Sequence, residues 1–158
     1  IGYAPHISLV KANYLLWESI ERNQYITAFY GVLDASHRTL AYANAGHNPP
    51  LLLDAAGNVK FIDRGGVPLG MFRDTRFYEY YLTIEPNEVL VLYTDGVTEA
   101  LSPEGEEFGR QRLAESVKKW RDLSAKDLIT AVQKDVTNWT DGGGATDDVT
   151  FFIVKALP

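Results

Sequence analysis

The stretch Val89-Leu90-Val91-Leu92-Tyr93-Thr94-Asp95-Gly96 is an apolar run that is followed, after one threonine, by a carboxylate and a glycine. Such a run predicts a buried strand. A second run of the same kind, Val149 to Val154, directly follows Asp147 and Asp148. If the two strands are antiparallel neighbours, the end of the first meets the start of the second. The carboxylates at these two positions would then converge.

Converging carboxylates repel one another unless a cation lies between them. Magnesium and manganese ions accept oxygen ligands and are the natural candidates. The alternative is that Asp95-Gly96 and Asp147-Asp148 are ordinary turn residues, since aspartate and glycine are common in turns. Position alone leaves both interpretations open.

The remaining pattern predicts an α+β protein with a mainly antiparallel meander of strands. An amphipathic helix is expected over His6 to Arg22, with Tyr14 and Trp17 in the core. Two later helices are expected over Arg110 to Trp120 and over Ala125 to Trp139, the second capped by Ser124. Strands are expected over Tyr25–Leu33, Thr39–Ala43, Leu51–Leu53, Val59–Ile62, Phe77–Ile84, Glu88–Tyr93 and Val149–Val154.

Composition excludes several classes of protein. The chain has 158 residues, no cysteine and a formal net charge of −6. The missing cysteines exclude disulfide scaffolds, thiolate zinc sites and cysteine nucleophiles, and the acidic balance argues against general nucleic-acid binding. No apolar run approaches the roughly 18–20 residues of a membrane-spanning helix. The N-terminus has no signal-peptide pattern either, so a cytoplasmic location is expected.

Several short motifs follow one another in an order that is specific as a set. They are Ala45-Gly46-His47-Asn48-Pro49-Pro50, Val67-Pro68-Leu69-Gly70, Leu92-Tyr93-Thr94-Asp95-Gly96-Val97-Thr98-Glu99-Ala100, Phe108-Gly109 and Thr146-Asp147-Asp148-Val149-Thr150. Together they resemble the SpoIIE/RsbU-type branch of the PPM metal-dependent protein serine/threonine phosphatases. The resemblance extends from about Tyr25 to Lys155, almost the whole chain.

This resemblance implies an antiparallel β-sandwich flanked by helices that hydrolyses phosphoserine or phosphothreonine with two Mn²⁺ or Mg²⁺ ions. Asp95 and Asp147 match metal-binding positions of the family, and Gly96 and Asp148 match supporting ones. A metal-bound water would be the nucleophile, so no protein side chain is required as one. His47 matches a position near the site, where it could contact phosphate, water or a further metal ion, but the favoured interpretation is a histidine that holds its own loop in shape.

The chain departs from the family pattern in one respect. Relatives carry early metal-binding aspartates, one of them in an Asp-x-Ser-Gly-x-Gly string, and nothing from Ile1 to Gln24 resembles it. The chain begins with isoleucine. Residues 1–158 are therefore expected to be the C-terminal portion of a single phosphatase domain that lacks its first strands. Hydrolysis by this portion alone is expected to be slow or absent.

The resemblance also implies the partners. The substrate would be a phosphorylated regulator of the anti-anti-sigma type in bacterial signal transduction and stress response. The alternative is a non-catalytic pseudophosphatase or regulatory interaction module on the same scaffold. Unpaired strands at Tyr25–Leu33 and Val89–Tyr93 would favour a homodimer, whereas residues 1–22 folding back over the gap would give a monomer.

Overall fold

The computed structural model describes residues 4–21, 23–142 and 147–158. Some residues named in the sequence analysis lie outside this description: Arg22, Gly143–Ala145 and Thr146. The chain forms two compact units. The first contains the described residues up to Pro49 together with Asp63–Ile84, and the second contains Pro50–Ile62 and the described residues from Glu85 onward.

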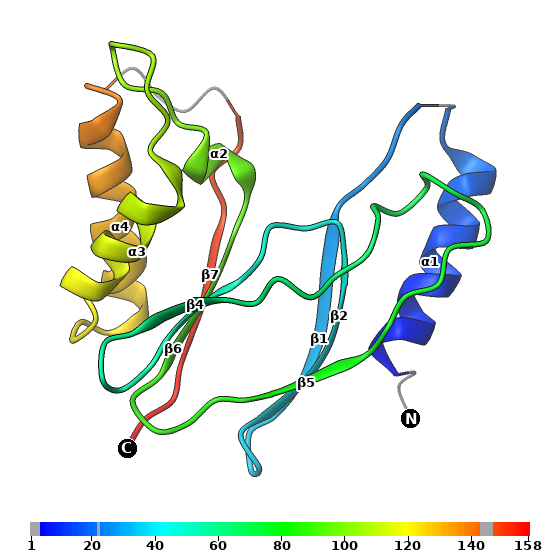
Figure 1. Cartoon of the computed structure of the whole chain (residues 1–158), viewed down its shortest axis with the longest axis horizontal. Helices are drawn as coiled ribbons and strands as arrows, with labels where there is room; N and C mark the ends of the chain where they lie inside the picture. Colours follow the sequence, from blue (N-terminus) through cyan, green and yellow to red (C-terminus); the bar gives the residue numbers. More distant parts are fainter. Residues whose placement is uncertain (1–3, 22, 143–146) are drawn as a thin grey trace. The chain divides into compact units, whose positions relative to one another are not determined.

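The first unit is a three-stranded antiparallel sheet with one helix. Its strands are β1 (Ala28–Asp34), β2 (Thr39–Ala45) and β5 (Tyr80–Thr83), in the order β1-β2-β5. Helix α1 (Pro5–Ser19) lies along β2 in this unit (Figure 1). The core between them contains Leu9 of the helix and Ala43 and Ala45 of β2. Because β2 is the central strand, β1 and β5 are the two edges of this sheet.

Helix α1 is anchored by a buried asparagine. Asn13 is 1% exposed, and its Nδ2 donates to the carbonyls of Phe72 at 3.0 Å and Arg73 at 2.9 Å. Its Oδ1 accepts from the backbone N–H of Gly70 at 2.9 Å. All three hydrogen bonds are made with the backbone of one loop, so Asn13 fixes the helix to residues 70–73.

The exposed face of α1 contains residues that the sequence pattern placed in the core. Tyr14 and Trp17 are not core residues, since they are 49% and 41% exposed. The helix is apolar on more than one side, and the side that contains Leu9, Ala12 and Leu16 packs in the core. A stripe assigned from periodicity alone therefore identified the wrong face.

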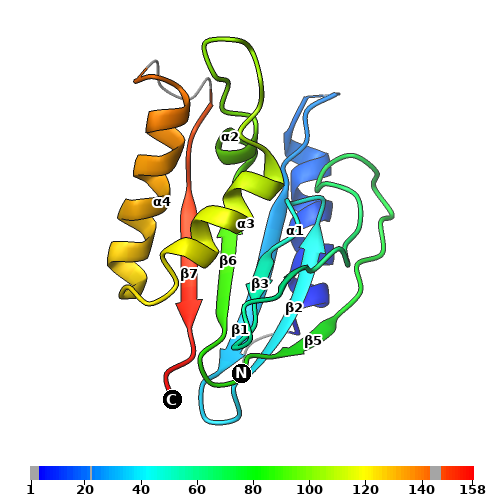
Figure 2. The ribbon, with the colours of Figure 1, turned by 60° about the vertical axis from the view of Figure 1, so that its left-hand side comes forward.

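The second unit is a four-stranded antiparallel sheet with helices packed against it. The sheet order is β4-β3-β6-β7. The core is formed by β3, β6 and two of the helices, with Leu51, Val91, Leu113 and Val132 all fully buried. Figure 2 shows α3 and α4 beside β6 and β7. The elements are β3 (Leu51–Leu53), β4 (Val59–Phe61), β6 (Val89–Tyr93), α2 (Asp95–Thr98), α3 (Gly109–Lys119), α4 (Ala125–Trp139) and β7 (Phe151–Lys155).

Local chemistry fixes the two long helices of this unit. The Ser124 side chain accepts a hydrogen bond from the backbone N–H of Asp127 at 3.1 Å, which confirms the predicted N-cap of α4. Asp135 of α4 accepts from the Ser116 hydroxyl at 2.7 Å and from the Trp120 indole at 2.8 Å. A single carboxylate thus joins α4 to α3 and to the residue that follows α3.

The expected meander is only partly present. Strands β5 and β6 follow one another along the chain, yet β5 pairs with β2 and β6 pairs with β3 and β7. Val89–Tyr93 was expected to be an unpaired edge, and that expectation is wrong: it is a largely buried interior strand, paired with β3 on one side and β7 on the other. The sequence also gave no indication of α2, the single helical turn that begins at Asp95.

Candidate metal centre

The end of β6 lies beside the start of β7. The two strands are antiparallel, and Tyr93 is directly opposite Phe151. Asp95 follows β6 by two residues and Asp147 and Asp148 precede β7, all in the second unit. The neighbouring antiparallel strands that the sequence argument required are thus present, and they bring the two aspartate-bearing segments together.

Thr94 joins the two segments through its side chain. Its hydroxyl donates to the carbonyl of Asp148 at 2.7 Å and accepts from the backbone N–H of Thr150 at 2.9 Å. The backbone N–H of Thr94 donates to the carbonyl of Thr150 at 3.2 Å. These three bonds extend the β6–β7 ladder past its last strand residues and hold Asp95 next to the Asp147-Asp148 backbone.

Gly96 permits this close approach because it has no side chain. A Cβ atom at this position would lie 2.6 Å from the carbonyl oxygen of Asp148 and 3.0 Å from that of Asp147. Both contacts are with backbone atoms, which cannot rotate away as the end of a side chain can. The glycine is buried, so the supporting role expected for it has a steric basis in this structure.

The two aspartates expected to bind metal are exposed, and each is oriented by a local bond. Asp95 Oδ1 accepts from the backbone N–H of Gly96 at 3.0 Å, and Asp147 Oδ1 accepts from that of Asp148 at 2.7 Å. In both residues the second carboxylate oxygen accepts no hydrogen bond from the described part of the chain. Two exposed carboxylates beside backbone carbonyls are hard oxygen donors of the kind that Mg²⁺ and Mn²⁺ accept. The donor chemistry therefore fits a divalent cation.

Two aspartates are nevertheless an incomplete ligand set. Across residues 4–21, 23–142 and 147–158, no three or more histidine, aspartate and glutamate side chains form a group that could hold a metal ion. Asp95 begins a helical turn and Asp147 lies in a bend, so the interpretation of these residues as turn formers also remains compatible with the structure.

His47 belongs to the first unit and is held by its own loop. Its backbone N–H donates to Asn44 Oδ1 at 2.8 Å, and its carbonyl accepts from Asn44 Nδ2 at 2.9 Å. Its Nδ1 lies 3.4 Å from the hydroxyl of Thr27. The loop is therefore shaped chiefly by the side chain of Asn44, which is 5% exposed.

Sequence reasoning missed two residues that shape these loops. Thr94 and Asn44 both lie inside the quoted or adjacent motif strings, but neither was assigned a role. The available signal was a hydroxyl or amide one to three residues before a motif aspartate or histidine, since such side chains commonly bond to nearby backbone. For Thr94 the partners lie 54 and 56 residues away, and no local pattern identifies them.

Comparison with known proteins assigns the chain to a group. The family model described as stage II sporulation protein E (SpoIIE) matches residues 1–157. Protein IcfG of Synechocystis is 36% identical over 143 residues, which are 90% of this chain and 22% of IcfG. Phosphoserine phosphatase RsbU of Bacillus subtilis is 23% identical over 155 residues, 98% of this chain and 46% of RsbU. The resemblance expected from the motifs is confirmed.

A solved structure supports the fold. The SiaA-PP2C domain of Pseudomonas aeruginosa superposes with a TM-score of 0.83 at 18% identity, over 96% of this chain and 61% of that one. The expected α+β class with antiparallel sheets is confirmed. The chain spans less than half the length of either curated relative. None of the helices in the described ranges has the length and hydropathy of a bilayer-crossing helix.

Proposed function

Because this chain belongs to the SpoIIE family, we propose that it forms part of a metal-dependent phosphatase that hydrolyses phosphoserine or phosphothreonine in a regulatory protein. One observation carries the proposal: the end of β6 and the start of β7 bring Asp95 next to Asp147 and Asp148. In this proposal residues 1–158 are the C-terminal portion of a single phosphatase domain.

Asp95 and Asp147 would hold Mn²⁺ or Mg²⁺ through the carboxylate oxygens that accept no hydrogen bond from the described residues. A bound divalent cation supplies charge neutralisation for a phosphate and lowers the pKa of a coordinated water. The protein's own contribution is positional. The hydrogen bonds of Thr94 fix the distance between the two segments, and Gly96 leaves the space for their close approach. Asp148 orients the Asp147 carboxylate by donating its backbone N–H to Oδ1.

The proposed substrate is a phosphorylated regulator of the anti-anti-sigma type, in signal transduction connected with bacterial stress. The support is the similarity to RsbU, which is named a phosphoserine phosphatase. A cytoplasmic location belongs to the same proposal, because a regulator of sigma factors acts where transcription takes place. His47 is kept as a candidate for contact with phosphate, since its position matches the family motif.

Paramagnetic relaxation by Mn²⁺ tests the metal site without requiring turnover. In a ¹H–¹⁵N spectrum of this chain, substoichiometric Mn²⁺ should broaden the amide signals of Gly96 and Asp148 before those of exposed acidic turns such as Asp34. Asp95→Asn and Asp147→Asn should each abolish the selective broadening at almost unchanged volume. Asp34→Asn, at the tip of a hairpin in the first unit, is the matched control. Equal broadening at all acidic turns would contradict the site.

A measurement of phosphate hydrolysis distinguishes an active phosphatase from a non-catalytic pseudophosphatase or interaction module. Residues 1–158 alone should hydrolyse p-nitrophenyl phosphate with Mn²⁺ very slowly, because too few carboxylates are present to hold two ions at catalytic spacing. A natural chain extended by the upstream segment should hydrolyse a phosphoserine peptide with a metal-dependent rate. If the extended chain binds Mn²⁺ and the phosphopeptide but does not turn over, the pseudophosphatase alternative is correct.

The expected homodimer is proposed to form through β1. Within the part of the chain that the structure describes, this strand pairs with β2 alone, and Tyr30 and Val32 on it are 42% and 49% exposed. It carries no lysine or proline, and its one charged residue is Asp34 at its end. A swap of α1 is a poorer route, since Asn13 fixes that helix to its own loop.

A further inference from the structure

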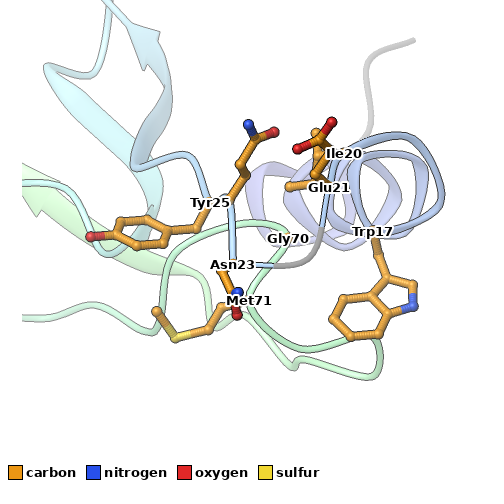
Figure 3. A pocket seen from close by; sticks show the side chains of 8 residues that line it. Trp17, Ile20, Glu21, Asn23, Tyr25, Gly70 and Met71 are labelled. Carbon is orange, nitrogen blue, oxygen red and sulfur yellow. The ribbon is translucent and has the colours of Figure 1, made fainter.

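A pocket with a volume of about 840 Å³ lies at the end of α1, but its polar groups do not converge. Figure 3 shows the Trp17 ring and the Glu21 carboxylate on opposite sides of the helix end. Charged groups converge instead in the second unit, at the turn between β3 and β4. Gly57 lies in this turn and has φ +90°.

The absence of a side chain at Gly57 leaves a space that two cations border. A Cβ atom at this position would lie 3.3 Å from Nη1 of Arg121, 3.5 Å from Cε of Lys118 and 3.8 Å from its Nζ. Both nitrogens therefore lie close to one point beside the turn. Two cationic groups in such an arrangement repel each other unless an anion lies between them.

Arg121 is held in this position by backbone carbonyls. Its Nη2 donates to the carbonyls of Asp54 and Ala55, both at 3.1 Å, and the residue is half-buried. The carbonyl of Arg121 in turn accepts from Nζ of Lys155 at 2.6 Å. The guanidinium is thus oriented before any ligand binds, and its Nη1 remains beside the space at Gly57.

Neither cation is neutralised by a carboxylate. Among the residues that the structure describes, no ion pair includes Lys118 or Arg121, and neither Nη1 nor Nζ donates a hydrogen bond. The carboxylate of Asp54 accepts two hydrogen bonds from Asn58 instead. Two donors of positive charge therefore lie at one open space without an acceptor.

We propose that this space binds a phosphate group, whose oxygens accept hydrogen bonds from Nη1 of Arg121 and Nζ of Lys118. A phosphate dianion carries enough charge for both cations and offers several acceptor oxygens, whereas a carboxylate carries a single charge. A guanidinium that is oriented in advance suits such a ligand.

The phosphate site is separate from the proposed metal centre. Leu53, directly before the turn, pairs with Val89 at the start of β6, whereas Asp95 follows the end of β6. All of the residues that form the phosphate site belong to the second unit. The proposal does not rest on phosphatase activity, because neither a metal ion nor hydrolysis takes part in it.

The test is a metal-free NMR titration of this chain with inorganic phosphate at constant ionic strength. The amide signals of Gly57 and Asn58 should shift saturably at millimolar phosphate, and those of Gly96 and Asp148 should not move. Sulfate, a tetrahedral dianion, should compete with phosphate. Nitrate, a planar monoanion, should bind about fivefold more weakly than sulfate.

A phosphate ester distinguishes the two sources of the group. If N-acetyl-O-phosphoserine amide binds more tightly than inorganic phosphate, the site takes a phosphorylated side chain of a protein. If it binds equally or more weakly, the site takes the free ion.

Variants of the chain complete the test. Lys118→Gln should weaken phosphate binding by about fivefold, and Lys118→Arg should preserve it. Lys134→Gln removes the same charge from an exposed position of α4 and should leave the affinity unchanged. An unchanged affinity in Lys118→Gln, equal affinities for sulfate and nitrate, or no saturable shift up to about 50 mM phosphate would overturn the proposal.

Discussion

Thr94 and Gly96 position the candidate metal centre by opposite means, one by adding hydrogen bonds and the other by leaving space. Thr94 ties β6 to the segment before β7, and Gly96 lets the backbone of Asp148 come within contact distance. Neither residue carries a charge, so neither needs to touch a metal ion to affect its binding. Both effects can be measured by substitution.

Gly96→Ala should destabilise the second unit and weaken Mn²⁺ binding. The added methyl group meets two backbone carbonyls, and overpacking of this kind costs about 1–3 kcal/mol. Urea denaturation gives the loss of unfolding free energy. Gly66→Ala is the control, because a Cβ there meets nothing closer than 3.7 Å. Equal stability of the two variants would show that the Asp148 segment moves away easily.

Thr94→Val removes the hydroxyl at nearly constant shape. We expect a loss of about 1 kcal/mol in unfolding free energy, because the Thr150 N–H and the Asp148 carbonyl lose their partner. Mn²⁺ affinity should fall about tenfold, as is typical when a residue that orients ligands is removed. Thr94→Ser keeps the hydroxyl and should bind Mn²⁺ like the parent chain in calorimetry. If the serine variant binds as weakly as the valine variant, the methyl group rather than the hydroxyl is responsible.

At the scale of the element, the hairpins are closed by aspartates in their turns. Asp34 accepts hydrogen bonds from the backbone N–H of Ser36 at 3.0 Å and of His37 at 3.1 Å, and from the Ser36 hydroxyl at 2.6 Å. Asp54 closes the β3–β4 hairpin in a similar way, with two bonds from Asn58 at 2.8 Å each. Side-chain to backbone hydrogen bonds thus close the turns of both hairpins.

The β1–β2 turn should loosen only in strong acid. Hydrogen bonds from Ser36 above all, and then from His37, hold the pKa of Asp34 well below its ordinary value. A depressed pKa means that the carboxylate stabilises the turn at all pH values above the unfolded pKa, which is about 3.9, and that this support is lost as pH falls through the folded pKa. Carboxyl carbon NMR measures the titration. Ser36→Ala should raise the pKa of Asp34 more than His37→Asn does, and the reverse order would contradict the assignment.

For the molecule as a whole, the proposed dimer would form through the exposed apolar side chains of β1. An antiparallel pairing of two copies centred on Gly31 would place Tyr30 opposite Val32 of the second copy, an aromatic and β-branched pair that stabilises sheets. Asp34 would lie opposite Ala28, so no like charges meet. The pairing would extend the three-stranded sheet without altering either copy.

Light scattering over a dilution series tests this association. The parent chain should show a dimer mass at concentrations on the order of 100 µM, and Val32→Lys should be monomeric because it places two like charges at the new strand pair. Phe152→Lys, on the edge strand β7 where Phe152 is 62% exposed, should leave the mass unchanged. A monomeric parent chain at this concentration would end the dimer proposal.

Features that depend on neighbours in the chain could be predicted from the amino-acid sequence. The bounds of α4 and its Ser124 cap follow from local periodicity and capping chemistry, and β6 follows from an apolar run that ends at a polar residue. The ordered motifs identified the family, and the paired aspartates beside two strands indicated the candidate site. These features can be predicted because each depends on residues that are close together in the sequence.

Strand pairing and the choice of buried faces could not be predicted from the sequence and came from the packing of the folded chain. It separated β5 from β6 into different sheets, and it exposed Tyr14 and Trp17 although the helix pattern assigned them to the core. It also revealed the bond between Thr94 and Asp148, which lie 54 residues apart. The physical reason is the same in each case. The sequence shows that an apolar side chain must be buried or that a hydroxyl can form a hydrogen bond. Which residue it contacts depends on how distant segments pack together.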